Sequence, residues 1–178
     1  MQNSPHQNHF QLLNMPRRYD LDLAQLADQY RQLQAQVHPD RFTQADAAAR
    51  RASMQLAAQA NDAYRTLKDP IQRGQYLLSL EQQQDTAHDG RMAIDFLEQQ
   101  MTLRETLQEL PEQSEPLIAL GEFQQQVSEL FGAKKTQLSD AFQDPDPVTW
   151  GAADNLIREL QFLNKLRQEA DELEEQLL

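Results

Sequence analysis

The 178-residue chain contains no cysteine, which excludes disulfide bonds, thiolate zinc sites and iron–sulfur clusters held by its own side chains. Glycine occurs only five times and aromatic residues make up 7% of the chain, so helices around an aliphatic core are expected. No apolar run approaches the ~20 residues of a membrane-spanning helix, and residues 1–9 lack the apolar stretch of a signal peptide. These absences favour a cytoplasmic protein with no cofactor or metal of its own.

The composition that remains is typical of an all-α protein, because Gln, Leu, Ala, Glu and Arg are abundant and most of them favour helix. Residues 1–80 contain nine Lys/Arg against seven Asp/Glu, whereas residues 81–178 contain seven against 21, and the whole chain has a net charge of −12. An acidic second half repels nucleic acid, so nucleic-acid binding is not expected. The asymmetry favours two modules with different partners, although a solvated acidic face explains it equally well.

The first half contains the pattern of a helical hairpin. Asp22 is a good N-cap for a first helix, and Pro39 ends that helix near Val37 or His38 because proline disfavours helix at the residue before it. The apolar residues of this helix recur at helical spacing and form one stripe, made of Leu23, Leu26, Tyr30, Leu33 and Val37.

A second helix is expected over about residues 45–67, and its small side chains would let it lie close to the first. Its apolar face is formed by Ala49, Leu56, Ala60, Ala63 and Leu67. Asp69-Pro70 predicts the N-cap and first residue of a shorter helix that runs through Leu80. One or two helical turns are expected upstream, over residues 9–13.

The second half is predicted to be a three-helix bundle. Residues 82–91 are polar and aperiodic, which predicts a linker between a domain at 1–81, ordered from about residue 8, and a domain at 92–178. The bundle helices are expected over about residues 92–110, 115–142 and 150–177. The last helix carries a heptad-like seam of Leu156, Leu163, Leu166, Ala170, Leu173 and Leu177.

The triplet His38-Pro39-Asp40 lies in the loop of the predicted hairpin. Proline stiffens an exposed turn, and a carboxylate held there is well suited to pair with an arginine of another protein. His38 and Asp40 could instead form a general acid–base pair, but no Ser, Cys or second acid stands at a recognisable spacing. A metal site is poorly supported, because the four histidines lie in unrelated segments.

A hairpin with this triplet in its loop resembles the J domain of DnaJ-type co-chaperones over residues 8–80. The resemblance implies that His38, Pro39 and Asp40 contact a DnaK-class chaperone and trigger its ATPase, with Asp40 engaging a chaperone arginine. Members of this family also use a basic face on the helix before the triplet. The candidates for that face are few here, namely Tyr30, Arg31 and Arg41.

The second half is similar to that of the HscB family of J-proteins, which deliver an IscU-type iron–sulfur scaffold to the chaperone HscA. The matching segments are residues 76–80 (YLLSL), 96–97 (FL) with 103–105 (LRE), and 160–166 (LQFLNKL). The cysteine-bearing amino-terminal region of some mitochondrial relatives is missing, which favours a bacterial form. The resemblance implies an HscA-like chaperone and an IscU-like scaffold as partners.

In this family the scaffold-binding face comes from the first bundle helix and a phenylalanine of the last. The corresponding residues are Leu97, Met101, Arg104, Glu105 and Phe162. On pattern alone, such residues are more often ordinary bundle packing, although Leu97 and Met101 lie away from the better core stripe and Phe162 falls beside the heptad seam. The core stripe of the first bundle helix is formed by Phe96, Leu103, Leu107 and Leu110.

The sequence therefore predicts a co-chaperone, not an enzyme, with a J domain followed by a three-helix bundle. It would stimulate a partner's ATPase and deliver the scaffold to it, and binding both partners at once would raise the local concentration of the scaffold. Two alternatives stay open. The bundle could serve a different client, or His38 and Asp40 could belong to a hydrolytic enzyme.

Overall fold

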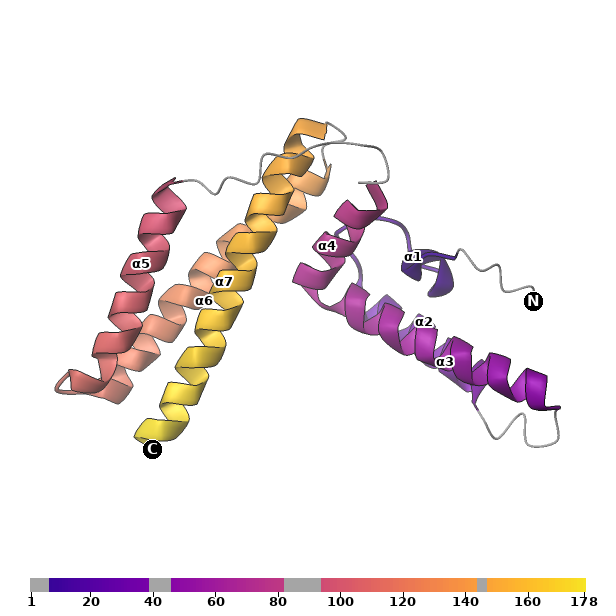
Figure 1. Ribbon diagram of the computed structural model, residues 1–178, viewed down its shortest axis with the longest axis horizontal. Coiled ribbons are helices and arrows are strands. Elements are labelled where there is room, and N and C mark those ends of the chain that lie inside the picture. Colours follow the sequence, from indigo (N-terminus) through magenta and orange to yellow (C-terminus); the bar gives the residue numbers. More distant parts are fainter. Residues whose placement is uncertain (1–6, 39–45, 82–93, 144–146) are drawn as a thin grey trace. The chain divides into compact units, whose positions relative to one another are not determined.

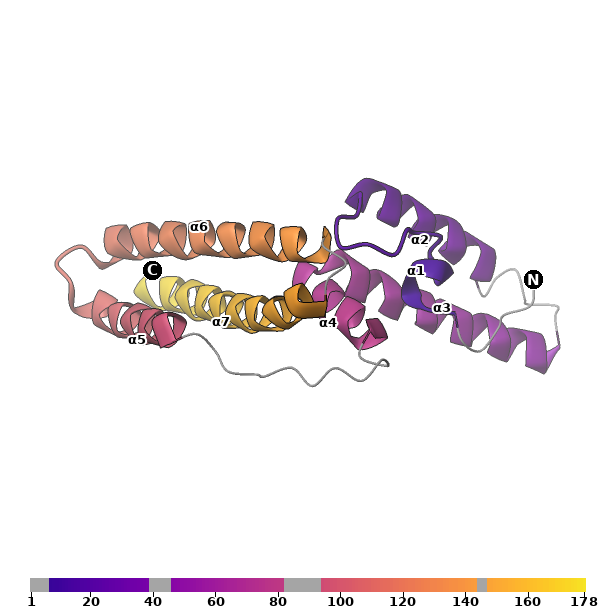
Figure 2. The same ribbon diagram turned by 90° about the horizontal axis from the view of Figure 1, so that it is seen from above.

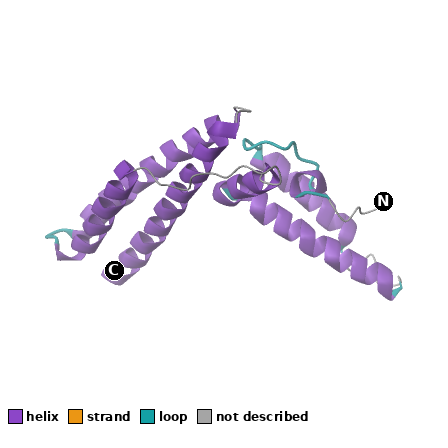
Figure 3. Ribbon diagram, turned by 45° about the horizontal axis from the view of Figure 1, so that its top comes forward, coloured by secondary structure: helices purple, strands orange, loops and turns teal. Residues whose placement is uncertain are grey.

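The computed structural model describes residues 7–38, 46–81, 94–143 and 147–178. Every regular element in these ranges is helical, which confirms the all-α prediction (Figure 3). The chain divides into two compact units, Met1–Glu81 and Gln82–Leu178, and each is described by itself (Figure 1). Within the described ranges, no helix combines the length and the apolar character needed to cross a lipid bilayer.

The first unit consists of α1 (His9–Leu12), α2 (Leu23–Val37), α3 (Ala47–Lys68) and α4 (Pro70–Glu81). The long helices α2 and α3 lie side by side and run in opposite directions (Figures 1 and 2). Alanines at the contact allow this close approach, since Ala60 and Ala63 are fully buried together with Leu26 and Leu67. The helical hairpin predicted from the apolar spacing is confirmed.

Aspartate caps set where these helices begin. The Asp22 carboxylate accepts hydrogen bonds from the backbone N–H groups of Ala24 and Gln25, at 2.9 and 3.1 Å. Asp69 does the same for the N–H of Gln72 at 2.8 Å, so both predicted caps are confirmed. The helix α3 begins at Ala47, two residues later than predicted, because Asp46 caps it by accepting from the Ala49 N–H at 2.7 Å.

A buried arginine joins the end of α3 to α4 and to the chain before α2. The Arg73 side chain is only 5% exposed, and its Nη1 donates to the Leu67 carbonyl at 2.6 Å. The guanidinium lies 4.8 Å from the ring centroid of Tyr19, whose pKa burial raises to about 12 against the opposing charge of Arg73. Arg73 thus supplies a donor to a carbonyl at the helix end, where intrahelical donors run out.

Replacing Arg73 with methionine is expected to lower the free energy of unfolding of the first unit by about 2–4 kcal/mol. The variant keeps an apolar stem but removes the donor to Leu67 and the cation over Tyr19. Urea denaturation followed by circular dichroism measures the change. The matched control is Arg51→Met on the exposed surface of α3, which should stay within about 0.5 kcal/mol of the parent. Equal stability of both variants would contradict this role.

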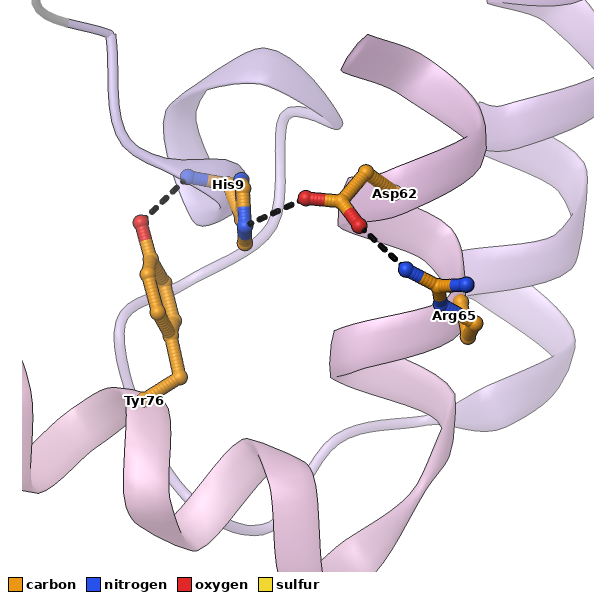
Figure 4. Close-up of polar contacts among 4 residues, drawn as sticks. All are labelled: His9, Asp62, Arg65 and Tyr76. Atoms are coloured by element: carbon orange, nitrogen blue, oxygen red, sulfur yellow. Dashed lines mark hydrogen bonds and ion pairs between the residues drawn. The ribbon is translucent and has the colours of Figure 1, made fainter. Parts of the chain in front are cut away.

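The short helix α1 is held by a histidine that reaches two other helices (Figure 4). The backbone N–H of His9 donates to the Tyr76 hydroxyl at 2.9 Å, and the two rings stack with centroids 4.3 Å apart. Nε2 of His9 lies 3.6 Å from an oxygen of Asp62, whose other oxygen accepts from Arg65 at 2.7 Å. Burial lowers the pKa of His9, and the nearby Asp62 carboxylate opposes that shift.

The lowered pKa of His9 predicts that the first unit loses stability as the pH falls below the ordinary value of 6.5. In that range the unfolded chain binds a proton that the folded chain resists, so protonation favours unfolding; above pH 6.5 both forms are neutral. Melting temperatures measured between pH 8 and pH 5 should show this loss. His9→Phe keeps the ring stack on Tyr76 but cannot titrate, and it should flatten the profile. Parallel profiles for parent and variant would contradict the assignment to His9.

The second unit consists of α5 (Ile94–Glu109), the 3₁₀ turn η3 (Leu110–Glu112), α6 (Pro116–Gln143) and α7 (Pro147–Leu177). The helices α6 and α7 are antiparallel neighbours, and α5 packs against α7 (Figures 1 and 2). Both α6 and α7 begin with proline, whose fixed backbone angle suits the first helical position. This explains why α7 starts at Pro147, before the predicted Trp150.

The bundle core is mainly aliphatic and includes the buried ring of Phe123. Its buried members are Leu103, Leu110, Leu120, Phe123, Val127, Leu163, Leu166 and Ala170. The predicted stripe of α5 is confirmed, since Phe96 is also buried and Leu107 packs partly buried against this core. The predicted seam of α7 is buried at Leu163, Leu166 and Ala170, whereas Leu156 is only partly buried, and Ile157 and Leu160 are buried although the seam did not include them. A helix enclosed by two neighbours buries a broader face than an a/d stripe.

Candidate partner-binding surfaces

The end of α2 is fixed directly before the loop that carries the triplet. Val37 is buried, and its carbonyl accepts a 2.7 Å hydrogen bond from the Ser53 hydroxyl of α3. His38 follows in an extended conformation, with φ −60° and ψ 132°, and its side chain is exposed. Pro39, Asp40 and Arg41 lie outside the described residues. The hairpin therefore fixes the position and the direction in which the loop begins.

The two α2 residues expected to support the triplet differ in their surroundings. Tyr30 is half-buried, stacks on Tyr64 with centroids 4.3 Å apart, and donates its hydroxyl hydrogen to Asn61 at 2.9 Å. Arg31 has a side chain 70% exposed and pairs with Asp28 on the same helix. The orientation of the Tyr30 ring is thus set by α3, whereas the charge of Arg31 lies in an exposed pair within α2.

Two further cationic side chains, which the sequence prediction did not include, lie on α3 at this end of the hairpin. Arg50 and Arg51 are exposed near the start of α3, a few residues beyond the loop that carries the triplet. The sequence prediction took only the helix before the triplet and Arg41 as sources of positive charge. Helical spacing after the loop would have identified both arginines, because neither falls on the apolar face of α3.

One face of α5 exposes apolar side chains to solvent. Leu97 is 44% exposed and Met101 64% exposed, so neither belongs to the bundle core. Ile94, 73% exposed, lies three residues before Leu97 on the same side of the helix and was missed by the sequence prediction. We call Ile94, Leu97 and Met101 the α5 strip. Glu105 is exposed one turn further along. The α5 strip is therefore an exposed apolar surface bordered by a charged side chain.

The other two predicted site residues make contacts inside the bundle. Phe162 is half-buried, packs against the core, and meets Phe96 edge-to-face with centroids 5.9 Å apart. Arg104 lies 5.8 Å above the Phe162 ring, and its Nη1 is 3.2 Å from Oε2 of Glu169 on α7. Phe162 therefore lies closer to the core than its place beside the seam suggested. These two residues join α5 to α7, and the α5 strip lies next to them.

Neither surface is a metal centre in the part of the chain that the structure describes. No group of three or more His, Cys, Asp or Glu side chains is placed there to hold a metal ion. The two surfaces are instead an exposed loop start and an apolar helix face, and both are suited to contacts with other proteins. The acid–base alternative pairs the exposed His38 with Asp40, which lies outside the described residues.

Comparisons with known proteins relate the chain to one family. Residues 92–171 match the family described as the HSCB C-terminal oligomerisation domain. The chain is 44% identical over 170 residues to the co-chaperone protein HscB homolog of Photobacterium profundum, covering 94% of this chain and 97% of that protein. The homolog of Aliivibrio salmonicida is 42% identical over 173 residues, covering 96% and 99% of the two chains.

Two solved structures share the fold over nearly the whole chain. The chaperone HscB from Vibrio cholerae has a TM-score of 0.84 at 39% identity, and the match covers 97% of this chain and 100% of that one. The human co-chaperone protein HscB also has a TM-score of 0.84, at 28% identity, with 99% and 86% covered. The match therefore includes both units.

Proposed function

Because the chain belongs to the HscB family of co-chaperones, we propose that it stimulates the ATPase of an HscA-like, DnaK-class chaperone and delivers an IscU-like iron–sulfur scaffold to it. The proposed site of action is the cytoplasm of a bacterium, since the similar proteins named above include bacterial ones. In this role the protein would act on the ATPase of its partner and would hydrolyse no ATP itself. It would also hold no cluster, because it has no cysteine to ligate one.

The observation that carries the proposal is the anchored end of the hairpin. The Ser53–Val37 hydrogen bond fixes where α2 stops, and His38 leaves it in the extended conformation that precedes Pro39-Asp40. In the proposal His38, Pro39 and Asp40 contact the chaperone, with Tyr30, Arg31 and Arg41 beside them. A preformed loop start lowers the entropy that binding must remove.

The scaffold would bind the α5 side of the second unit. The proposed contacts are Leu97, Met101, Arg104, Glu105 and Phe162, to which the exposure of Ile94 adds a sixth. Burying two or three exposed apolar side chains against a partner is favourable without any loss of the bundle core. Tethering both partners to one chain raises the concentration of the scaffold at the chaperone, which couples delivery to ATP hydrolysis.

The test is the steady-state ATPase rate of the HscA-like chaperone from the same cell, with this protein added alone and together with apo scaffold. Stimulation by the protein, increased further by the scaffold, is the expected result. Stimulation that the scaffold does not change would favour a different client. No stimulation, combined with hydrolase activity that His38→Gln removes, would favour the enzyme alternative and overturn the proposal.

A further inference from the structure

Glu169 was not among the residues predicted from the sequence, yet it links α5 to α7. Its Oε2 is 3.2 Å from Nη1 of Arg104 on α5, and its Oε1 is 3.7 Å from Nζ of Lys165 on α7. The Glu169 side chain is 28% exposed and that of Arg104 43%, so this pair is only partly screened by water. One carboxylate thus holds a cation of each helix.

Arg104 also contacts the ring of Phe162 on α7, and Phe96 of α5 contacts the same ring. Arg104 lies above the Phe162 ring, 5.8 Å from its centroid. Phe96 meets the same ring edge-to-face, and Lys134 of α6 approaches Phe96 at 5.8 Å. Phe96 and Arg104 are therefore anchors, separated by about two turns of α5 at 3.6 residues per turn.

Leu97 and Met101 lie between these two anchors along α5. Because the direction of these side chains depends on the roll of α5 about its own axis, the contacts of Phe96 and Arg104 with Phe162 restrain that direction on either side of them. If the second anchor were released, the buried Leu103 and Leu110 would still keep α5 on the bundle. Releasing this contact would therefore alter the orientation of the α5 strip without unfolding the bundle.

We propose that Glu169 is a positioning residue, which holds Arg104 on Phe162 and thereby fixes the α5 strip in the orientation that the scaffold binds. This inference rests on the proposed function only for the identity of the partner. The predicted change in the dynamics of α5 is independent of that function and can be measured on the free protein.

The central variant is Glu169→Gln, which keeps the shape of the side chain and removes its charge. The matched control is Glu172→Gln, an exposed glutamate three residues further along α7. The Kd for an apo IscU-type scaffold, measured by calorimetry, should weaken about three- to tenfold for Glu169→Gln and stay within about twofold for the control. Thermal unfolding should be nearly the same for both, which separates positioning from a general structural role.

Two further measurements complete the test. Hydrogen exchange of the α5 amides should be faster in free Glu169→Gln than in free Glu172→Gln. Adding Glu169→Gln to Arg104→Gln should weaken scaffold binding no further, because the two residues act as one unit. Equal Kd values for the Glu169 and Glu172 variants, or additive effects in the double variant, would overturn the inference. Absence of scaffold binding by the parent would overturn the proposed function, and hydrogen exchange would then decide the effect on α5.

Discussion

Replacing Asp40 with asparagine is expected to abolish stimulation of the chaperone ATPase while leaving the helical content unchanged. Asparagine has nearly the same shape as aspartate but carries no charge, so it cannot make the charge-assisted, two-pronged pair with an arginine. A hydrogen bond to a charged group contributes about 1.5–3 kcal/mol, and each 1.4 kcal/mol is about tenfold in affinity. Stimulation should therefore fall at least about tenfold at fixed concentration.

The fold gives a reason to expect no structural damage from this change. The end of α2 is held by the Ser53 hydroxyl on the Val37 carbonyl, and α3 begins at the cap supplied by Asp46. Neither contact involves Asp40. Far-ultraviolet circular dichroism and the melting temperature check this expectation alongside the ATPase rate.

The matched control is Asp46→Asn, which makes the same chemical change six residues later. Asparagine is as good an N-cap as aspartate, so α3 should keep its start and stimulation should persist. Equal loss of stimulation in both variants would show that stimulation depends on the total negative charge near the loop and not on Asp40 in particular. Full stimulation by Asp40→Asn would remove the central claim about the triplet.

Replacing Leu97 and Met101 together with alanine is expected to weaken scaffold binding strongly with little loss of stability. These side chains are 44% and 64% exposed, so the bundle core does not depend on them. Apolar side chains at the centre of an interface each contribute about 1–2 kcal/mol, which predicts a Kd about 30- to 1000-fold weaker for the pair. Calorimetric titration with apo scaffold measures the Kd.

The chain offers an equally exposed residue as a control for lost apolar surface. Ile118 on α6 is 59% exposed and lies outside the α5 strip, so Ile118→Ala should leave scaffold binding unchanged. A large fall in the melting temperature of the Leu97/Met101 variant would show that these residues pack in the core. Phe162 cannot serve in the same test, because it packs against Phe96 and Arg104 and its removal would also destabilise the bundle.

Local chemistry allowed much of the fold to be predicted. Asp22, Asp69 and Pro70 act on backbone groups within a few residues, so the helix starts that they set can be predicted from the adjacent sequence. The periodicity of Phe96, Leu103 and Leu110 likewise identified the buried side of α5. The triplet and the family resemblance predicted an HscB-type co-chaperone, which the comparisons confirm at the level of the family.

Contacts between distant elements could not be predicted in this way. The hydrogen bond from His9 to Tyr76 joins residues 67 positions apart, and the one from Arg104 to Glu169 joins residues 65 apart. Periodicity tells which residues share a face of a helix, but not which neighbour that face meets or at what register. Only the tertiary structure therefore decided that Arg104 and Phe162 join α5 to α7, while Ile94, Leu97 and Met101 are exposed.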